Sequence, residues 1–209
     1  MNKINYQLEL DKIIDGLQKE NIVPTLLLHS CCAPCSSYCL SYLADYFKIT
    51  IFYYNPNISP TEEYQKRVEE QKRLIRELPV KHEVSFKEGI YEPDRFFEMA
   101  KGLEDIPEGG ERCFKCYELR QREAALYAAE NNFDFFTTTL SISPHKNAAK
   151  LNEIGLKLEK EYGIRYLVSD FKKKGGYLKS IEYSRQYDLY RQNYCGCIYS
   201  KMEAEKRKR

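Results

Sequence analysis

The sequence predicts an α/β fold, a single Rossmann-like domain with a mostly parallel sheet and helices on both faces. Short extended apolar runs alternate in regular order with longer runs of helical periodicity, and strands separated by such helices are typical of parallel sheets. No internal repeat, low-complexity tract or Pro/Gly-rich linker divides the 209 residues. A chain of this length can bury a substantial core, so we expect residues 1–209 to form a single domain.

The expected elements follow from the apolar pattern in chain order. The leading segment, residues 1–22, contains a helix over 5–20, and the apolar run TLLLH at 25–29 predicts a buried strand. A helix over 61–78 opens on Thr61, with Glu62 and Glu63 in its first turn, where acidic side chains favour the helix dipole. The other expected helices cover 36–46, 93–102, 113–131, 147–162 and 176–187, and the other expected strands cover 49–55, 80–86, 133–140 and 165–170. Residues 201–209 are expected to form a basic tail.

The charge and the N-terminus limit the class of protein. The net charge of +2, from 33 basic and 31 acidic side chains, is nearly balanced and says little about partners. The opening MNKINYQLELDKII has no charged-then-apolar signal pattern, and no apolar run approaches the length of a membrane span. We therefore expect a cytoplasmic protein without a membrane partner. Clustered cysteines in that compartment are more often metal ligands or redox catalysts than structural bridges.

The residues that carry chemistry follow the predicted strands. HSCCAPCS closes the first strand, NPNISP the second, TLSISPHKN the strand at 133–140, and DFKKKGG the strand at 165–170. Ligands of parallel α/β sheets bind beyond the carboxyl ends of the strands. We therefore expect these four loops to converge on one edge of the sheet.

Two groups among the eight cysteines have the spacing of metal ligands. Thiols three residues apart at the start of a helix share one face, and the positive end of the helix dipole favours their thiolates. Four thiolates from a CC pair and a CxxC pair suit either a [4Fe–4S] cluster or a tetrahedral zinc ion, and unligated buried thiols are a third alternative. The two groups are Cys31 and Cys32, with Cys35 and Cys39 nearby, and Cys113 and Cys116.

The third cysteine group lies near the C-terminus in the segment YRQNYCGCIYS. Cys195 and Cys197 are separated only by Gly196, a spacing that can close a strained, readily reduced disulfide. Such a pair is suited to carrying two electrons. The alternative is a pair of unlinked thiols near the end of the fold.

These segments together resemble the signature blocks of the QueH family of epoxyqueuosine reductases. The blocks are HSCCAPCS, YYNPNISPTEEYQKR, GGERCFKCYELR, TTTLSISPHKN and YRQNYCGCIYS, which span residues 29–200 in order. The resemblance implies reduction of the epoxide of epoxyqueuosine to queuosine, the last step of queuosine biosynthesis, at the wobble position of tRNAs with GUN anticodons. It also implies a Rossmann-like domain of the HUP or PP-loop-like kind with a [4Fe–4S] cluster, and an electron donor that the sequence does not identify.

The resemblance also implies roles for the cysteines. The cluster ligands fall on Cys31, Cys32, Cys113 and Cys116, and the redox-active pair falls on Cys195 and Cys197. Members of the family can carry aspartate at the position of Cys35, and either side chain could hold an additional iron. Cys39 lies within the apolar pattern, so we expect it to be a small buried hydrophobe.

The remaining loop residues are candidates for contacts with the tRNA. Amides suit the cyclopentane diol or a base edge, or else cap turns, and they are Asn55, Asn57 and Asn147. Ammonium groups suit the anticodon-loop phosphates, or else belong to a solvated loop, and they are Lys146, Lys172, Lys173 and Lys174. His29 is either a proton donor or a hydrogen-bonded structural histidine.

Two other classes of protein compete with this interpretation. A PP-loop-type ATP-dependent tRNA-modifying enzyme needs a glycine-rich SGGxDS turn after the first strand, and the sequence there is HSCCAPC. A non-catalytic zinc-stabilised binding module leaves the CGC pair without a role. The lack of glycine in HSCCAPC and the presence of the CGC pair both favour the reductase.

Overall fold

The structure is a computed structural model that describes residues 4–207. These residues form one five-stranded sheet of order β3-β2-β1-β4-β5, in which every adjacent pair of strands is parallel. The sheet confirms the Rossmann-like α/β prediction and is parallel throughout. The strands are β1 (Thr25–His29), β2 (Lys48–Tyr53), β3 (Val84–Glu88), β4 (Phe135–Thr138) and β5 (Arg165–Tyr166).

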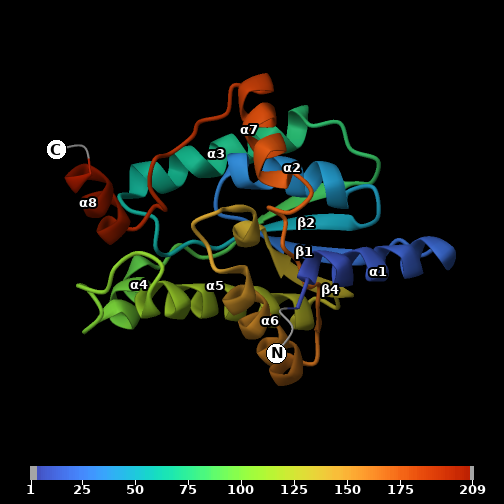
Figure 1. The fold of residues 1–209 in the computed structure, drawn as a ribbon, viewed down its shortest axis with the longest axis horizontal. Coiled ribbons are helices and arrows are strands. Elements are labelled where there is room, and N and C mark those ends of the chain that lie inside the picture. The colour runs from blue at the N-terminus through green and yellow to red at the C-terminus, as the bar shows by residue number, and fades with distance from the viewer. Residues whose placement is uncertain (1–3, 208–209) are drawn as a thin grey trace.

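Helices cover both faces of the sheet, with α2, α3 and α7 on one side and α4, α5 and α6 on the other (Figure 1). The helices are α1 (Tyr6–Lys19), α2 (Ala33–Leu43), α3 (Thr61–Glu77), α4 (Pro93–Ala100), α5 (Glu111–Glu130), the 3-10 helix η1 (Thr139–Ile142), α6 (Ala148–Tyr162), α7 (Gly176–Gln186) and α8 (Ile198–Lys206). Within residues 4–207, no helix has the length and the apolar character that a bilayer crossing requires.

The central strand divides the core into two layers. Side chains of a strand point alternately to opposite faces, so Leu26 and Leu28 enter one layer and Leu27 the other. The layer of Leu26 contains the apolar faces of α1, α2 and α3, and the layer of Leu27 contains those of α5 and α6. Cys39 of α2 is fully buried in the first layer, which confirms that it behaves as a small hydrophobe.

Several boundaries differ from the sequence-based expectation, among them the start of β3 at Val84 instead of residue 80, and three of the differences have local reasons. β4 ends at Thr138 because the chain turns into η1, where the Thr138 hydroxyl accepts the N–H of Leu140 at 3.2 Å. β5 has two residues, since Ser169 leaves the sheet to pair with Asn152 of α6. α2 begins at Ala33, three residues earlier than expected, because Pro34 fits the first turn of a helix.

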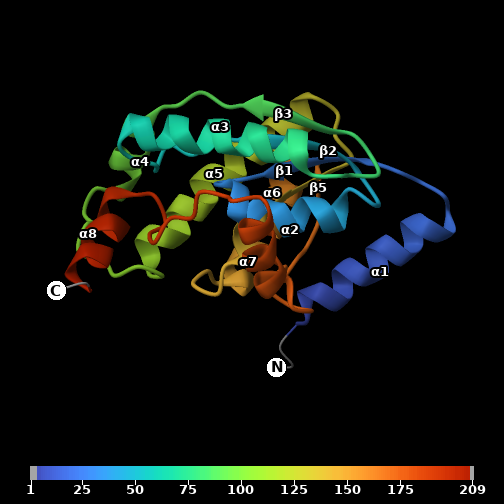
Figure 2. The same ribbon diagram turned by 90° about the horizontal axis from the view of Figure 1, so that it is seen from above.

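The segment expected to be a basic tail is mostly the helix α8, which the periodicity did not reveal. Arg112 of α5, 2% exposed, donates to the carbonyls of Leu103 and Glu104, and its guanidinium lies 3.5 Å from Glu203 of α8. Both views place α8 beside the end of the molecule where α5 begins (Figures 1 and 2). Residues 208 and 209 of that tail, and 1–3 of the leading segment, lie outside the described residues.

Two helical glycines allow a matched test of the α6 packing. An added Cβ at Gly155 of α6 would overlap the Tyr166 ring, whereas one at Gly16 of α1 would meet nothing within 4 Å. We expect Gly155→Ala to lower the free energy of unfolding by about 1–3 kcal/mol through overpacking. Gly16→Ala should raise it by up to about 1 kcal/mol through helix propensity. Urea unfolding under reducing conditions measures both, and equal stability of the two variants would contradict this packing of β5 on α6.

Candidate active site

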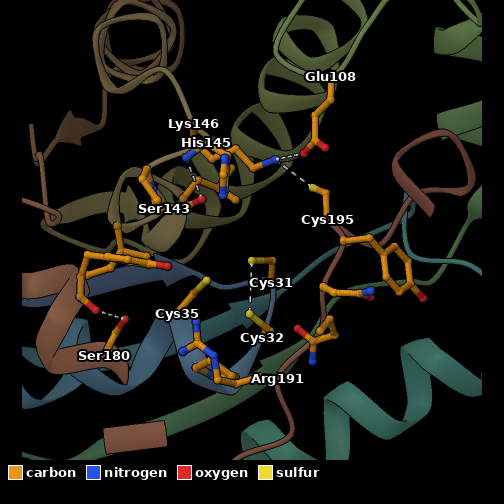
Figure 3. A pocket seen from close by; sticks show the side chains of 18 of the residues that line it. Cys31, Cys32, Cys35, Glu108, Ser143, His145, Lys146, Ser180, Arg191 and Cys195 are labelled. Carbon is orange, nitrogen blue, oxygen red and sulfur yellow. Dashed lines mark hydrogen bonds and ion pairs between the residues drawn. The ribbon is translucent and has the colours of Figure 1, made fainter. Parts of the chain in front are cut away.

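The carboxyl end of the sheet opens into a cavity of about 350 Å³. Its walls come from the loop after β1, the loop between η1 and α6, the start of α7 and the segment 191–195 (Figure 3). The polar and sulfur-bearing side chains at its centre are Cys31, Cys32, Cys35, Lys146, Arg191 and Cys195. Three of the four loops expected at this edge therefore contribute to it or flank it, and the C-terminal CGC segment joins them.

Three cysteines form a compact group at the start of α2. The sulfurs of Cys31, Cys32 and Cys35 all lie within 4.8 Å of one another, and those of Cys31 and Cys32 are 3.9 Å apart. Hydrogen bonds from the Cys32 and Cys35 thiols hold the pKa of Cys31 well below its usual range, and the same bonds raise the pKa values of Cys32 and Cys35. Within the group, ionisation is therefore favoured at Cys31 over Cys32 and Cys35. This cysteine triad could bind a metal ion.

The CxxC pair lies across from this triad. Cys113 and Cys116 occupy the first turn of α5, and the N–H of Gly109 donates to the Cys113 sulfur at 3.2 Å. Both cysteines line a small second cavity together with Cys195 and Cys197, while Cys195 also lines the larger one. The structure therefore gathers the three cysteine groups around neighbouring spaces, but the 4.8 Å group contains neither Cys113 nor Cys116.

The CGC segment is held in place through its backbone. Gly196 has a φ of +122°, in the region that favours glycine, and its carbonyl accepts the N–H of Ser59 at 3.0 Å. Arg67 of α3 donates to the Cys195 carbonyl at 3.2 Å, and the Ser200 hydroxyl accepts the N–H of Cys195 at 3.1 Å. Cys195 and Cys197 are both free thiols in this arrangement.

Two fully buried arginines lie beside the cysteines, and the sequence analysis did not single them out. Arg120 of α5 donates to the Cys116 carbonyl at 3.2 Å and approaches the Asn55 amide oxygen at 3.5 Å. Arg67 pairs with Glu63 at 2.7 Å and is 2% exposed. Within residues 4–207, one guanidinium nitrogen of each arginine has no hydrogen-bond partner. Both arginines occupy positions of the apolar stripe of their helix, which is the signal that could have revealed them.

Lys146 also lies in this site, between the two cavities. Its residue exposure is 8%, and its ammonium lies 3.0 Å from the Cys195 sulfur and 3.3 Å from a Glu108 carboxylate oxygen (Figure 3). Burial by itself disfavours the charged form, yet the Cys195 sulfur, Tyr117 and Glu108 raise the pKa of Lys146 well above its usual range. Lys146 therefore stays an ammonium group at neutral pH.

His29 has the hydrogen bonds of a structural residue. It is fully buried, with Nδ1 2.9 Å from the Thr138 hydroxyl and Nε2 3.1 Å from the carbonyl of Tyr54. A carbonyl only accepts, so Nε2 donates and Nδ1 accepts. Burial, followed by the charge of Arg120, lowers the pKa of His29 to about 4. The imidazole is neutral at neutral pH, which favours the structural alternative over the proton donor.

The three candidate amides differ in their surroundings. Asn55 is fully buried and donates to the Ser30 carbonyl at 2.7 Å, so it ties the loop after β2 to the loop after β1. Asn57 lines the small cavity, and its amide oxygen is buried without a partner among residues 4–207. Asn147 is exposed and caps α6 by accepting the N–H of Lys150 at 3.0 Å. Asn57 is thus the amide best placed to receive a ligand donor.

The lysine triplet lies in the turn before α7, next to Tyr177 and Ser180 of the cavity wall. Lys172 pairs with Asp170 at 2.6 Å, and Lys174 pairs with Asp11 of α1 at 2.6 Å. Lys173 is exposed. The triplet therefore borders the cavity, with Lys173 and Lys174 exposed and Lys172 partly buried.

Comparison with known proteins finds a matching family and relatives that share its name. The profile of the family described as Epoxyqueuosine reductase QueH matches residues 26–203. A protein of that name from Streptococcus pyogenes serotype M1 is 42% identical over 200 residues, covering 95% of this chain and 78% of its own length. Proteins of the same name from Staphylococcus epidermidis and Staphylococcus aureus are 44% and 43% identical over 205 residues, covering 96% of this chain and 86% and 85% of their own lengths.

Replacing Arg67 by an uncharged side chain tests whether this arginine holds the CGC segment in place. We expect Arg67→Met to lower the free energy of unfolding by about 3 kcal/mol, because it leaves the half-buried Glu63 and the Cys195 carbonyl without their partner. The variant should also speed alkylation of Cys195 and Cys197. Arg76→Met, at an exposed position of the same helix, should change stability by no more than about 0.5 kcal/mol. Unchanged alkylation rates in Arg67→Met would show that α3 does not hold the segment.

Proposed function

Because the chain belongs to the epoxyqueuosine reductase QueH family, a family of oxidoreductase enzymes, we propose that it reduces epoxyqueuosine to queuosine. The substrate base lies at the wobble position of tRNAs with GUN anticodons. The observation that carries this proposal is the thiol-lined cavity at the carboxyl end of the sheet, where Cys31, Cys32, Cys35 and Cys195 share one space. Its volume of about 350 Å³ lies within the range of small-molecule sites, which suits an extruded base.

Loss of an epoxide oxygen to leave an alkene requires two electrons and two protons, and the oxygen departs as water. The site must therefore contain a reductant, a proton donor and groups that hold the base. Free thiols at two walls of one cavity supply reducing groups, and the buried ammonium of Lys146 supplies an acid. Competing reactions with solvent are limited because most of these side chains are buried.

The donor set fits an iron–sulfur cluster. All the candidate ligands are thiols, which bind iron–sulfur clusters, and the buried guanidinium groups of Arg67 and Arg120 offset the negative charge that such a group brings. The residues that would hold a [4Fe–4S] cluster are Cys31, Cys32, Cys113 and Cys116, and Cys35 would hold one additional iron. When bound, the cluster would transfer electrons one at a time, and the additional iron would supply a Lewis acid for the oxygen.

The CGC pair is proposed as the redox-active dithiol. Cys195 opens into the base-sized cavity, and Cys197 is its neighbour across Gly196, whose positive φ lets the chain reverse between them. Oxidation of two thiols to a disulfide releases two electrons and two protons, which equals the requirement of the reaction. An electron donor of the cell restores the dithiol after each turnover.

The remaining residues are proposed to bind the tRNA. Asn57 has a buried amide oxygen that can accept a hydrogen bond from the base or the diol, and Asn55 and Asn147 hold the loops on either side of it in place. Lys172, Lys173 and Lys174 give the rim positive charge for the anticodon-loop phosphates, and Lys146 adds positive charge inside the cavity. A tRNA substrate is consistent with the expected cytoplasmic location.

The cluster and the activity are tested in one preparation. Protein purified without oxygen should be brown, contain about four irons per chain with one more alongside, and convert epoxyqueuosine in tRNA to queuosine with a chemical reductant. Replacement of Cys31, Cys32, Cys113 or Cys116 by Ala should remove the colour and the activity. Iron and sulfide analysis and nucleoside mass spectrometry measure these outcomes.

Cys39→Ala is the matched control for these replacements. Cys39 lies one turn beyond Cys35 but inside the apolar core, so its loss should lower stability and leave the iron content unchanged. Zinc at full occupancy in an active preparation would refute the cluster, and absence of conversion by iron-loaded protein would refute the reductase.

The lysine triplet provides a separate prediction on tRNA binding. Replacement of Lys172, Lys173 and Lys174 by Ala should weaken binding of an anticodon stem-loop and reduce the dependence of affinity on salt, because fewer counterions are released. The iron content should not change. The control replaces three exposed lysines at the amino end of the sheet, namely Lys19, Lys48 and Lys81. Equal salt dependence in both triple variants would show that Lys172, Lys173 and Lys174 belong to a solvated loop and do not contact tRNA phosphates.

A further inference from the structure

Lys146 occupies a position where a surface lysine is not expected. It follows η1 in the loop that leads to α6, yet its ammonium points inward and contacts the Cys195 sulfur at 3.0 Å. The Glu108 carboxylate lies on its other side at 3.3 Å, and the Tyr117 ring centroid lies 5.9 Å away. Lys146, Glu108 and Cys195, which lie together in Figure 3, line both the larger and the smaller cavity. These three side chains therefore stand at the junction of the two cysteine-lined spaces.

Burial of this ammonium needs a compensating charge. A lysine is seldom buried unless it is paired, because its ammonium loses its hydration on burial. Glu108 supplies one negative charge, and its own backbone N–H is fixed by the Glu203 carboxylate at 3.0 Å. The second partner is a thiol that can itself ionise. A sulfur 3.0 Å from a buried ammonium has the electropositive surroundings that are typical of reactive cysteines.

We propose that Lys146 is a catalytic residue that holds Cys195 as a thiolate and delivers a proton to the epoxide oxygen as that oxygen leaves. The inference rests on the proposed function, and it gives Lys146 a chemical role that differs from contact with tRNA phosphates. A bound epoxide in the cavity would meet a nucleophilic sulfur and an acid on the same wall. The two groups are already in contact, so neither has to move far for the reaction.

The step balances with the residues present. Before reaction the site holds the Cys195 thiolate, the Cys197 thiol and the Lys146 ammonium. The two sulfurs lose two electrons and form one S–S bond, and both C–O bonds of the epoxide break to leave a C=C bond. One proton comes from Lys146 and one from Cys197, so the oxygen leaves as water. Reduction of the disulfide by a thiol or protein dithiol returns the protons.

The test separates the charge of Lys146 from its proton. Lys146→Gln removes both, whereas Lys146→Arg keeps the positive charge on a group that does not give up its proton near neutral pH. Iodoacetamide alkylation at pH 7, with the modified cysteine located by mass spectrometry, reports the thiolate without any need for turnover. Two assays report the reaction: the rate of a single turnover of epoxyqueuosine in tRNA, and kcat and KM measured over many turnovers. Lys150→Gln is the control, since Lys150 lies nearby and pairs with Glu153 at 2.6 Å.

The expected results differ between the two variants. Lys146→Gln should slow alkylation of Cys195 about tenfold or more and lower kcat by roughly 10²- to 10⁴-fold, with KM changed little. Lys146→Arg should alkylate within about threefold of the original protein and still lose about 10²-fold in kcat. Lys150→Gln should match the original protein in both assays. Iron content and thermal unfolding of each variant show that the fold is retained.

Other results would overturn the inference. An unchanged alkylation rate in Lys146→Gln would refute the thiolate, and full turnover in Lys146→Arg would refute the proton transfer. A rise in KM alone would make Lys146 a binding residue. Should the unaltered protein fail to convert epoxyqueuosine, the proposed function fails, and the alkylation difference still reports whether Lys146 sets the state of Cys195.

Discussion

Positive charge buried beside sulfur is the constraint on which the carboxyl-end edge of this protein depends. Arg67, Arg120 and Lys146 are each no more than 8% exposed, and each lies against a segment that carries a cysteine. Unpaired charges in a low-dielectric interior are costly, so these three cations favour negative charge at the sulfur-bearing segments beside them. At this edge the hydrogen bonds of the cysteine triad lower the pKa of Cys31, whereas burial in the apolar core raises the pKa of Cys39.

Buried cations also connect parts of the chain that are distant in sequence. Arg67 joins α3 to the CGC segment, Arg112 joins α5 to α8, and Lys146 joins the loop before α6 to that segment. Glu203 of α8 accepts the N–H of Glu108, which faces Lys146. The C-terminal part of the chain thus completes the site and is not an appendage. Its docking depends on ion pairs, so the geometry around Cys195 is sensitive to charge substitutions at several positions.

The local pattern predicted most of the fold because burial and secondary structure share the same periodicity. A strand buried on both faces reads as a continuous apolar run, as TLLLH does, and an amphipathic helix repeats every three to four residues. Boundaries were less certain where the partner was distant. The end of β5 was misplaced because Ser169 prefers the side chain of Asn152, and α8 was missed because its apolar face is formed by few residues.

The sequence by itself determined that cysteines and polar loops would meet at one edge, since parallel strands must present their carboxyl ends together. It also carried the ordered motifs by which the family is recognised. Only the tertiary structure decided that Cys31, Cys32 and Cys35 form one compact group while Cys113 and Cys116 lie with Cys195 and Cys197. It likewise decided that Lys146 turns inward. The reason is physical: whether a charged side chain faces water or a cavity depends on whether an opposite charge lies within reach. For Lys146 that charge is Glu108, 38 residues earlier in the chain, and the Cys195 sulfur lies on its other side, 49 residues further along.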